Sequence, residues 1–140
     1  MILQFIQNNW FLFILLFLII GMLCLDPIRR RTSGIQSVSA VQLPQLMNHE
    51  NTVIVDVGDN NDFAKGHIAN AINIPVGQLK MNIARLEKHR KKEATIVLVC
   101  RSGQLAPRGA QVLKKENFSK LYTLTGGMNA WVKENLPVQR

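Results

Sequence analysis

Two short stretches, residues 52–57 and 94–99, are β-branched or apolar at nearly every position. Strands that are buried on both faces have this composition, and they occur mainly in parallel sheets covered by helices. Residues 71–74 and 121–124 read as two further strands, and helical patterns separate all four. The sequence therefore predicts an α/β fold in which helices flank both faces of a parallel sheet.

Five short helical segments are predicted around these strands, from apolar residues at helical spacing and from capping residues. Ser39 is a candidate N-cap for the first segment, and Gly66 is expected to close the second. Trp131 lies on the apolar side of the last segment. The predicted helical segments are residues 39–47, 62–65, 78–89, 104–117 and 128–135.

The N-terminal region contains an apolar run, residues 10–25, that carries no charge and no proline. Extended back to Ile6, the run reaches twenty residues, which is about the length that crosses a hydrocarbon core of about 30 Å. Trp10 is a candidate anchor at the membrane interface. Residues 1–26 are therefore predicted to form a transmembrane anchor, preceding the α/β domain, that contacts membrane lipid through residues 6–25.

Positive charge follows this apolar run and does not precede it. Asp26–Pro27 is expected to end the helix, and Arg29, Arg30 and Arg31 come directly afterwards. A cleaved signal peptide has the opposite arrangement, with Lys or Arg before its apolar region. Because cytoplasmic flanks carry an excess of Lys and Arg, we expect an uncleaved single-pass protein of the cytoplasmic membrane, with its C-terminal domain in the cytoplasm.

The rest of the chain divides into a basic linker, residues 27–36, and one domain, residues 37–140, which is long enough for a hydrophobic core. Cys24 and Cys100 are the only cysteines among the 140 residues. Since Cys24 lies in the apolar run, the two are not expected to pair. They supply no disulfide framework and no Cys/His cluster, so we expect no metal ion and no cofactor.

The net charge of +8 comes in part from a basic group in residues 80–92. Nucleic acid binding is one interpretation, but this group contains no Phe, Tyr or Trp for base stacking, and the chain has no nucleic-acid motif. A solvated helix face is a second interpretation, and attraction to anionic lipid is a third. We expect no nucleic acid partner.

Cys100 ends the run 94–99 and opens a short turn before a helical pattern. Such a turn aims backbone N–H groups and the positive end of a helix dipole into the loop, where they stabilise a thiolate. The thiolate is the nucleophilic form of cysteine. In open parallel sheets, ligands also bind beyond the carboxyl ends of the strands. A small buried cysteine at a strand end is the alternative, and the pattern alone leaves both open.

Four segments, taken in order, resemble the motifs of the rhodanese-like sulfurtransferase domain. They are the Asp-Val strand 53–57, the Gly-His-Ile and Ala-Ile-Asn-Ile-Pro signature within 63–75, the Cys-Arg-Ser-Gly loop 100–103, and the Gly-Gly, Trp and Leu-Pro element within 126–137. The resemblance extends over residues 37–139. With the apolar N-terminal run included, the chain is similar to the small membrane-anchored rhodanese-domain proteins of bacteria.

This resemblance implies a sulfurtransferase in which Cys100 is the catalytic nucleophile. The family's cysteine takes sulfane sulfur from a small donor, such as thiosulfate or a persulfide, and passes it to a thiol or protein acceptor. The loop that would bind substrate and surround the persulfide anion with its amides consists of Arg101, Ser102, Gly103, Gln104 and Leu105. The anchor further implies a partner at the membrane, such as a membrane protein complex.

Two positions depart from the family pattern. Leu105 stands where members often have arginine as the sixth loop residue, and Gly58 stands where many have arginine after the Asp-Val pair. Loss of a cation near Cys100 should weaken thiolate formation and the binding of small anionic donors. A catalytically weak or inactive docking module is therefore the alternative function. A phosphatase of the same fold is disfavoured, because Ala106 occupies the position of the arginine that grips its oxyanion.

Overall fold

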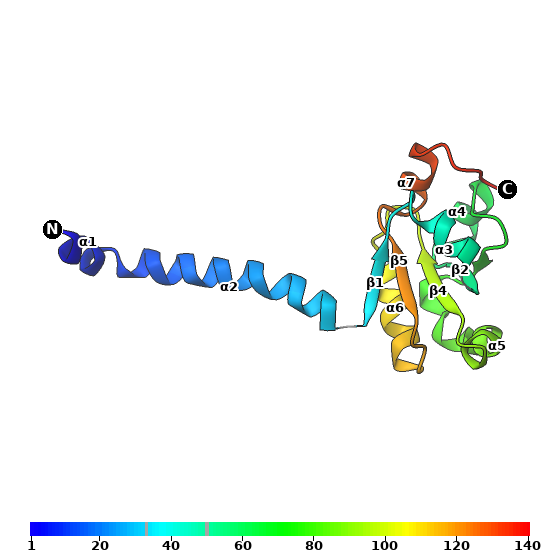
Figure 1. Ribbon diagram of the computed structural model, residues 1–140, viewed down its shortest axis with the longest axis horizontal. Coiled ribbons are helices and arrows are strands. Elements are labelled where there is room, and N and C mark those ends of the chain that lie inside the picture. Colours follow the sequence, from blue (N-terminus) through cyan, green and yellow to red (C-terminus); the bar gives the residue numbers. More distant parts are fainter. Residues whose placement is uncertain (33, 50) are drawn as a thin grey trace. The chain divides into compact units, whose positions relative to one another are not determined.

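The computed structural model describes residues 1–32, 34–49 and 51–140, and it describes their side chains except at 25–32 and 49. The chain forms two compact units, residues 1–33 and residues 34–140 (Figure 1). The first unit is helical, and the strands of the described chain all belong to the second.

The described part of the first unit consists of α1 (Ile2–Asn8) and α2 (Trp10–Thr32). Asn9 lies at the break between them, where its Nδ2 donates a hydrogen bond of 2.9 Å to the carbonyl oxygen of Phe5. Asparagine side chains compete in this way with the hydrogen bonds of a helix. The prediction of one continuous helix from Ile6 is therefore wrong, because the helix is interrupted at Asn9.

No single helix in the described residues is both long and apolar enough to cross a bilayer. The bent pair formed by α1 and Trp10–Cys24 does meet both conditions together, with an angle of 73° between its parts. The expected end at Asp26–Pro27 is also wrong, since α2 continues to Thr32. Proline costs a helix one hydrogen bond, but Leu25 and Arg29, both good helix formers, lie two residues before it and two residues after it.

The predicted linker, residues 27–36, overlaps both α2 and the first strand. The side chains of Arg29, Arg30 and Arg31, on which the predicted orientation in the membrane depends, lie outside the described residues.

In the described part of the second unit, five parallel strands form one sheet with the order β1-β5-β4-β2-β3 (Figure 1). The strands are β1 (Ile35–Val38), β2 (Thr52–Asp56), β3 (Ile72–Asn73), β4 (Thr95–Val99) and β5 (Leu121–Leu124). The predicted parallel α/β fold is confirmed, and the four predicted strands lie close to their expected bounds. Sequence reasoning misses β1, because this edge strand exposes Gln36 and Ser37 and therefore lacks an apolar run.

The helices of this unit are α3 (Leu43–His49), α4 (Asn60–Lys65), η1 (Val76–Gln78), η2 (Lys80–Leu86), α5 (Glu87–Lys91), α6 (Ala106–Lys115) and α7 (Gly127–Lys133). The single helix predicted over residues 78–89 is wrong. The segment consists of η1, η2 and α5. Asn82, inside η2, has φ −108° and ψ 19°, and its Nδ2 donates to the carbonyl oxygen of Gln78 at 2.9 Å, so the backbone is kinked there. The first helix begins later than predicted, after a turn in which Ser39 Oγ accepts the N–H of Gln42 at 3.3 Å.

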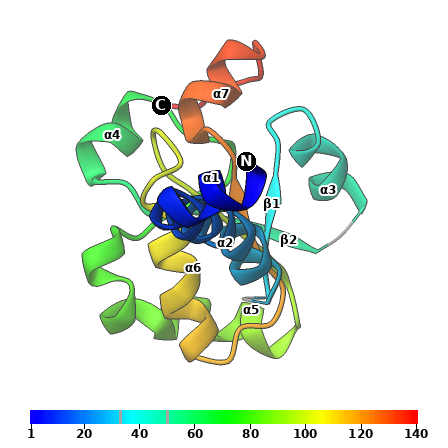
Figure 2. The same cartoon turned by 90° about the vertical axis from the view of Figure 1, so that its left-hand side faces the viewer.

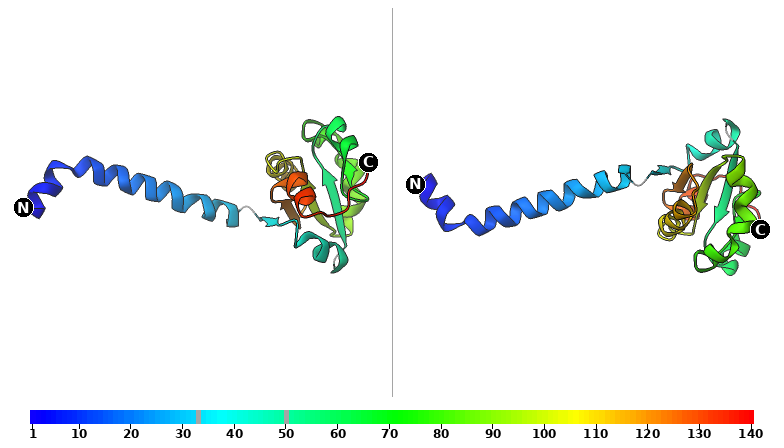
Figure 3. Two further views of the ribbon diagram at one scale, coloured as in Figure 1. Left: turned by 90° about the horizontal axis from the view of Figure 1, so that it is seen from above. Right: turned by 90° about the horizontal axis from the view of Figure 1, so that it is seen from below.

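Helices cover the sheet on both faces (Figures 2 and 3). The side chains of β4 are all buried and alternate between these faces. Ile96 and Leu98 pack in the cluster that includes α6, whereas Val97 and Val99 pack in the cluster that includes α3 and α7. Cys100 continues this alternation and lies on the α6 side, at the carboxyl end of the central strand. The sheet therefore directs the thiol toward the start of α6.

Candidate active site

The sulfur of Cys100 accepts hydrogen bonds from backbone amides of the loop that follows β4. The N–H of Gly103 lies 3.1 Å from Sγ, and the N–H of Leu105 lies 3.3 Å from it. Gly103 has φ +85°, a conformation that glycine adopts without strain. Leu105 is the N-cap of the ten-residue helix α6. Two N–H donors and the positive end of a helix therefore converge on the sulfur and stabilise negative charge there.

A pocket of about 400 Å³ lies beside this sulfur, between the loop, the end of β2 and η1. Cys100 itself is only 1% exposed, yet it lines the pocket. Apolar wall is supplied by Val57, Pro75, Val76 and Leu105. The thiol is thus packed against the core on one side and borders open space on the other, where a small ligand fits.

The structure places the predicted loop residues in different roles. Gly103 and Leu105 direct their amides at the sulfur, whereas Ser102 and Gln104 are exposed residues that line the pocket. The side chain of Leu105 is partly buried against the α6-side core. An arginine at this position would therefore leave the core and extend along the pocket.

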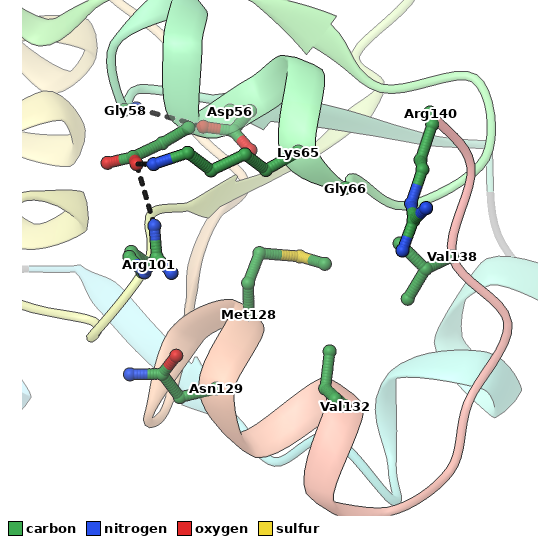
Figure 4. Close-up of a pocket in the computed structure, with 11 residues that line it drawn as sticks. Asp56, Gly58, Lys65, Gly66, Arg101, Met128, Asn129, Val132, Val138 and Arg140 are labelled. Atoms are coloured by element: carbon green, nitrogen blue, oxygen red, sulfur yellow. Dashed lines mark hydrogen bonds and ion pairs between the residues drawn. The ribbon is translucent and has the colours of Figure 1, made fainter.

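Arg101 lines the pocket beside the sulfur, but its guanidinium group is engaged by a carboxylate. Its Nη1 forms an ion pair of 2.7 Å with Oδ1 of Asp62, and the Nζ of Lys65 lies 3.5 Å from the same oxygen. The Arg101 side chain is 56% exposed, so this pair contributes at most about 1 kcal/mol to stability. Arg101 and Asp62 also line a neighbouring pocket of about 410 Å³, whose opposite side carries Val138 and Arg140 (Figure 4).

The N-terminus of α7 supports the Cys100 loop from behind. The N–H of Met128 donates to the carbonyl oxygen of Cys100 at 2.8 Å, and the N–H of Asn129 donates to that of Arg101 at 3.0 Å. This close approach requires Gly127, because a Cβ there would lie 2.1 Å from the Cys100 carbonyl oxygen. The sequence analysis identified Gly126 and Gly127 only as the Gly-Gly part of a family motif. In the sequence, the pair of glycines directly before the predicted helical segment 128–135 was the feature that could have indicated this support.

A fully buried Ala106 begins α6, with five residues between it and Cys100. A phosphatase of this fold needs an arginine at that position to bind its oxyanion through two parallel hydrogen bonds. The geometry therefore agrees with the sequence in disfavouring phosphate ester chemistry.

Asp56 places a buried carboxyl group at the end of β2, next to the site. It is 4% exposed, and its Oδ1 accepts the N–H of Gly58 at 2.9 Å. Burial raises the pKa of Asp56 above its ordinary value of 3.8, while the Gly58 hydrogen bond and the nearby His67 act in the opposite direction. The charged form of Asp56 is therefore less favourable in the folded protein than in the unfolded chain, which lowers the free energy of unfolding.

The Asp56→Asn variant is expected to be more stable than the wild type at neutral pH. The folded state holds the Asp56 proton more tightly than the unfolded chain, so the free energy of unfolding falls as the pH rises from 3.8 through the raised pKa. Asparagine keeps an oxygen for Gly58 and removes this titration. Urea unfolding at a series of pH values measures the difference between the two proteins. A difference that does not grow as the pH rises through this interval would contradict the prediction.

Comparison with known proteins assigns the family. The sequence profile of the rhodanese-like domain matches residues 39–134. The chain belongs to the rhodanese-like family. Thiosulfate sulfurtransferase GlpE of Shewanella oneidensis is 32% identical to it over 103 residues, which cover 74% of this chain and 98% of that protein. The uncharacterised protein YibN of Escherichia coli strain K12 is 31% identical over 140 residues, which cover 99% of this chain and 96% of that protein.

Solved structures share this rhodanese-like fold. The crystal structure of a rhodanese-related protein from Thermoplasma volcanium matches with a TM-score of 0.61 and 25% sequence identity, over 74% of this chain and 97% of that chain. The Shewanella protein and the crystallised Thermoplasma chain thus consist almost entirely of the matched region. A rhodanese-like domain of this length therefore folds without further segments.

Proposed function

We propose that Cys100 carries sulfane sulfur as a persulfide, at the cytoplasmic face of a bacterial membrane. The observation that carries the proposal is the convergence of the Gly103 and Leu105 amides on Sγ beside an open pocket. Relatives in this family include proteins named thiosulfate sulfurtransferase. A terminal sulfur anion needs converging N–H donors of this kind.

Sulfur transfer would take place in two displacement steps. In the first, the Cys100 thiolate attacks the outer sulfur of the donor, such as thiosulfate. A new S–S bond forms, the S–S bond of thiosulfate breaks, and sulfite leaves with the electron pair. In the second step, an acceptor thiolate attacks the outer sulfur of the Cys100 persulfide. The acceptor becomes the persulfide and Cys100 is released as the thiolate, so that no external oxidant or reductant is needed.

We expect a thiol persulfide or a protein persulfide to be a better donor than thiosulfate. Val57, Val76 and Leu105 give the pocket an apolar wall, and the cation Arg101 is engaged by Asp62. Thiosulfate carries two negative charges that this wall cannot compensate. A persulfide donor carries less charge at the sulfur and can use the apolar surface.

The Leu105→Arg variant is expected to raise kcat/KM for thiosulfate by about tenfold or more, because a hydrogen bond to a charged group contributes about 1.5–3 kcal/mol. The backbone N–H of residue 105 remains in place for the sulfur. Leu105→Met, which keeps the volume and adds no charge, is the matched control and should behave as the wild type. Steady-state kinetics with thiosulfate test this prediction. An unchanged kcat/KM for Leu105→Arg would show that the absence of a cation at position 105 does not limit thiosulfate turnover.

We further propose that the first unit anchors the domain in the membrane, with residues 6–25 in lipid. The large apolar side chains between Trp10 and Leu23 are not covered by other parts of the described structure. An apolar surface of this extent is normally covered by lipid or by a protein partner. A membrane protein complex is the expected partner. A reporter fused to the C-terminus should resist protease added to intact cells, whereas its digestion would reverse the proposed orientation.

The proposed activity is tested by intact-mass measurement. The domain, residues 34–140, is incubated with thiosulfate or with a small thiol persulfide, and the protein is then weighed and digested. A gain of one sulfur atom on the peptide that contains Cys100 is the expected result. No gain with either donor would overturn the proposal and would leave the non-catalytic docking module as the function.

A further inference from the structure

Among the side chains that the structure describes, exposed lysines from three separate segments gather at the amino-terminal edge of the sheet, opposite the edge that carries Cys100. They are Lys88, Lys91 and Lys92 in and after α5, Lys114 and Lys115 at the end of α6, and Lys120 directly before β5. A hydrogen bond of 3.1 Å from Arg90 Nη1 to the carbonyl oxygen of Glu116 joins the ends of α5 and α6. Figures 1 and 2 show α5, the end of α6 and the start of β1 at one end of the domain. We call this surface the lysine edge.

The lysine edge contains a polar pocket of about 260 Å³. Its lining includes Gly34, Gln36, Ser119, Lys120 and Tyr122. Residues that carry an ammonium group, an amide, a hydroxyl and a phenol therefore line a space that is larger than a phosphate group. Donors of this kind bind phosphate oxygens, and the ammonium group adds charge-assisted hydrogen bonds.

Carboxylates do not balance the lysines at this edge. Among the described residues there, Glu87 forms an ion pair with Arg90, which leaves Glu93 and Glu116 as the other acidic groups. Lysines in the last turn of a helix also compensate its dipole, which explains one or two at the ends of α5 and α6. Helix dipoles do not explain Lys120, which lies in a loop beside the pocket. The described part of this edge therefore has positive charge in excess of what the fold needs.

We infer that the lysine edge binds the anionic headgroups of membrane phospholipids, with a headgroup phosphate in the pocket beside Lys120. The inference rests on the membrane placement proposed above. The domain begins at Gly34, which lines this pocket and follows the apolar N-terminal segment in the chain. Headgroups are therefore the anionic surface that stays within reach of this edge.

Vesicle sedimentation with the domain, residues 34–140, tests this inference. The domain is expected to bind vesicles of equal parts phosphatidylglycerol and phosphatidylcholine, to be released by salt, and not to bind pure phosphatidylcholine. The Lys115→Glu/Lys120→Glu variant should bind the anionic vesicles at least about tenfold more weakly. The matched control, Lys80→Glu/Lys133→Glu, has the same net charge but changes exposed lysines away from this edge, and it should bind as the wild type.

Equal weakening by both double variants would show that only net charge matters and would overturn the inference, as would the absence of binding to anionic vesicles. Single-stranded RNA that displaces the domain from vesicles would assign the edge to nucleic acid instead. Sulfur loading at Cys100 is measured on the same preparations, so that lost lipid binding and lost sulfur transfer are distinguished. If the double variant fails to load sulfur, Lys120→Gln replaces it, with an expected loss of binding of about threefold or more.

Discussion

Replacing Cys100 by serine is expected to lower kcat/KM for every sulfur donor by at least about a thousandfold, since loss of a covalent nucleophile costs an enzyme this much or more. Serine cannot form the S–S bond in which the sulfur is carried. Its hydroxyl oxygen can still accept the Gly103 and Leu105 amides, which donate to Sγ in the wild type. The domain should therefore keep its fold, with a change in stability within about 2 kcal/mol.

Cys24 provides the matched control for this experiment. It is the other cysteine of the chain, it is exposed, and it lies in the first unit, outside the rhodanese-like domain. Full-length Cys24→Ser is expected to load sulfur as the wild type does, while full-length Cys100→Ser is not. Intact mass before and after addition of an acceptor thiol measures both. Sulfur that loads onto Cys100→Ser would show that the carrier is another group.

Replacing Gly127 by alanine is expected to have the largest effect on stability, about 2–5 kcal/mol. The left-handed conformation of Gly127, with φ +59°, costs a residue with a Cβ about 1–2 kcal/mol. The added Cβ would also lie 2.1 Å from the carbonyl oxygen of Cys100 and 2.7 Å from the amide nitrogen of Gly103. Both neighbours are backbone, so relief requires a shift of the loop itself, and overpacking of this kind costs about 1–3 kcal/mol.

The same substitution should impair sulfur loading even below the melting temperature. Relief of the overlap would lengthen the hydrogen bond from the Met128 N–H to Cys100 and would move the Gly103 amide that faces Sγ. For a domain of this size, the expected fall in melting temperature is about 10–30 °C. Gly77→Ala is the control for the melting temperature, because a Cβ at Gly77 meets nothing within 4 Å. Equal melting temperatures for the two variants would show that the α7 support is dispensable.

The central part of the fold could be predicted because the side chains of its strands are of types that are stable only when buried. The β-branched segments that became β2 and β4 are apolar at nearly every position, and only a doubly covered sheet buries such strands. The edge strand β1 could not be found in this way. Two of its four residues are exposed, and its pairing with β5 joins segments more than eighty residues apart.

Local competition by asparagine explains where helix prediction failed. Apolar spacing suggested one helix through Asn82 and another through Asn9, but in each case the amide side chain bonds to a backbone carbonyl oxygen four residues earlier. The spacing of apolar residues does not reveal such a bond, because the bond depends on the position of a side-chain hydrogen-bond donor. The break at Asn9 changes the N-terminal segment from one apolar helix into a bent pair.

The sequence by itself determined the parallel α/β class, the position of Cys100 directly after the strand predicted at 94–99, and the family, since these follow from apolar pattern and motif order along the chain. Only the tertiary structure decided which amides face the sulfur, that Arg101 pairs with Asp62, and that α7 holds the Cys100 loop. It also decided that lysines from three segments share one edge. These features depend on how distant segments meet, because a hydrogen bond or a charged surface is made by neighbours in space, whereas a local pattern records neighbours in the chain.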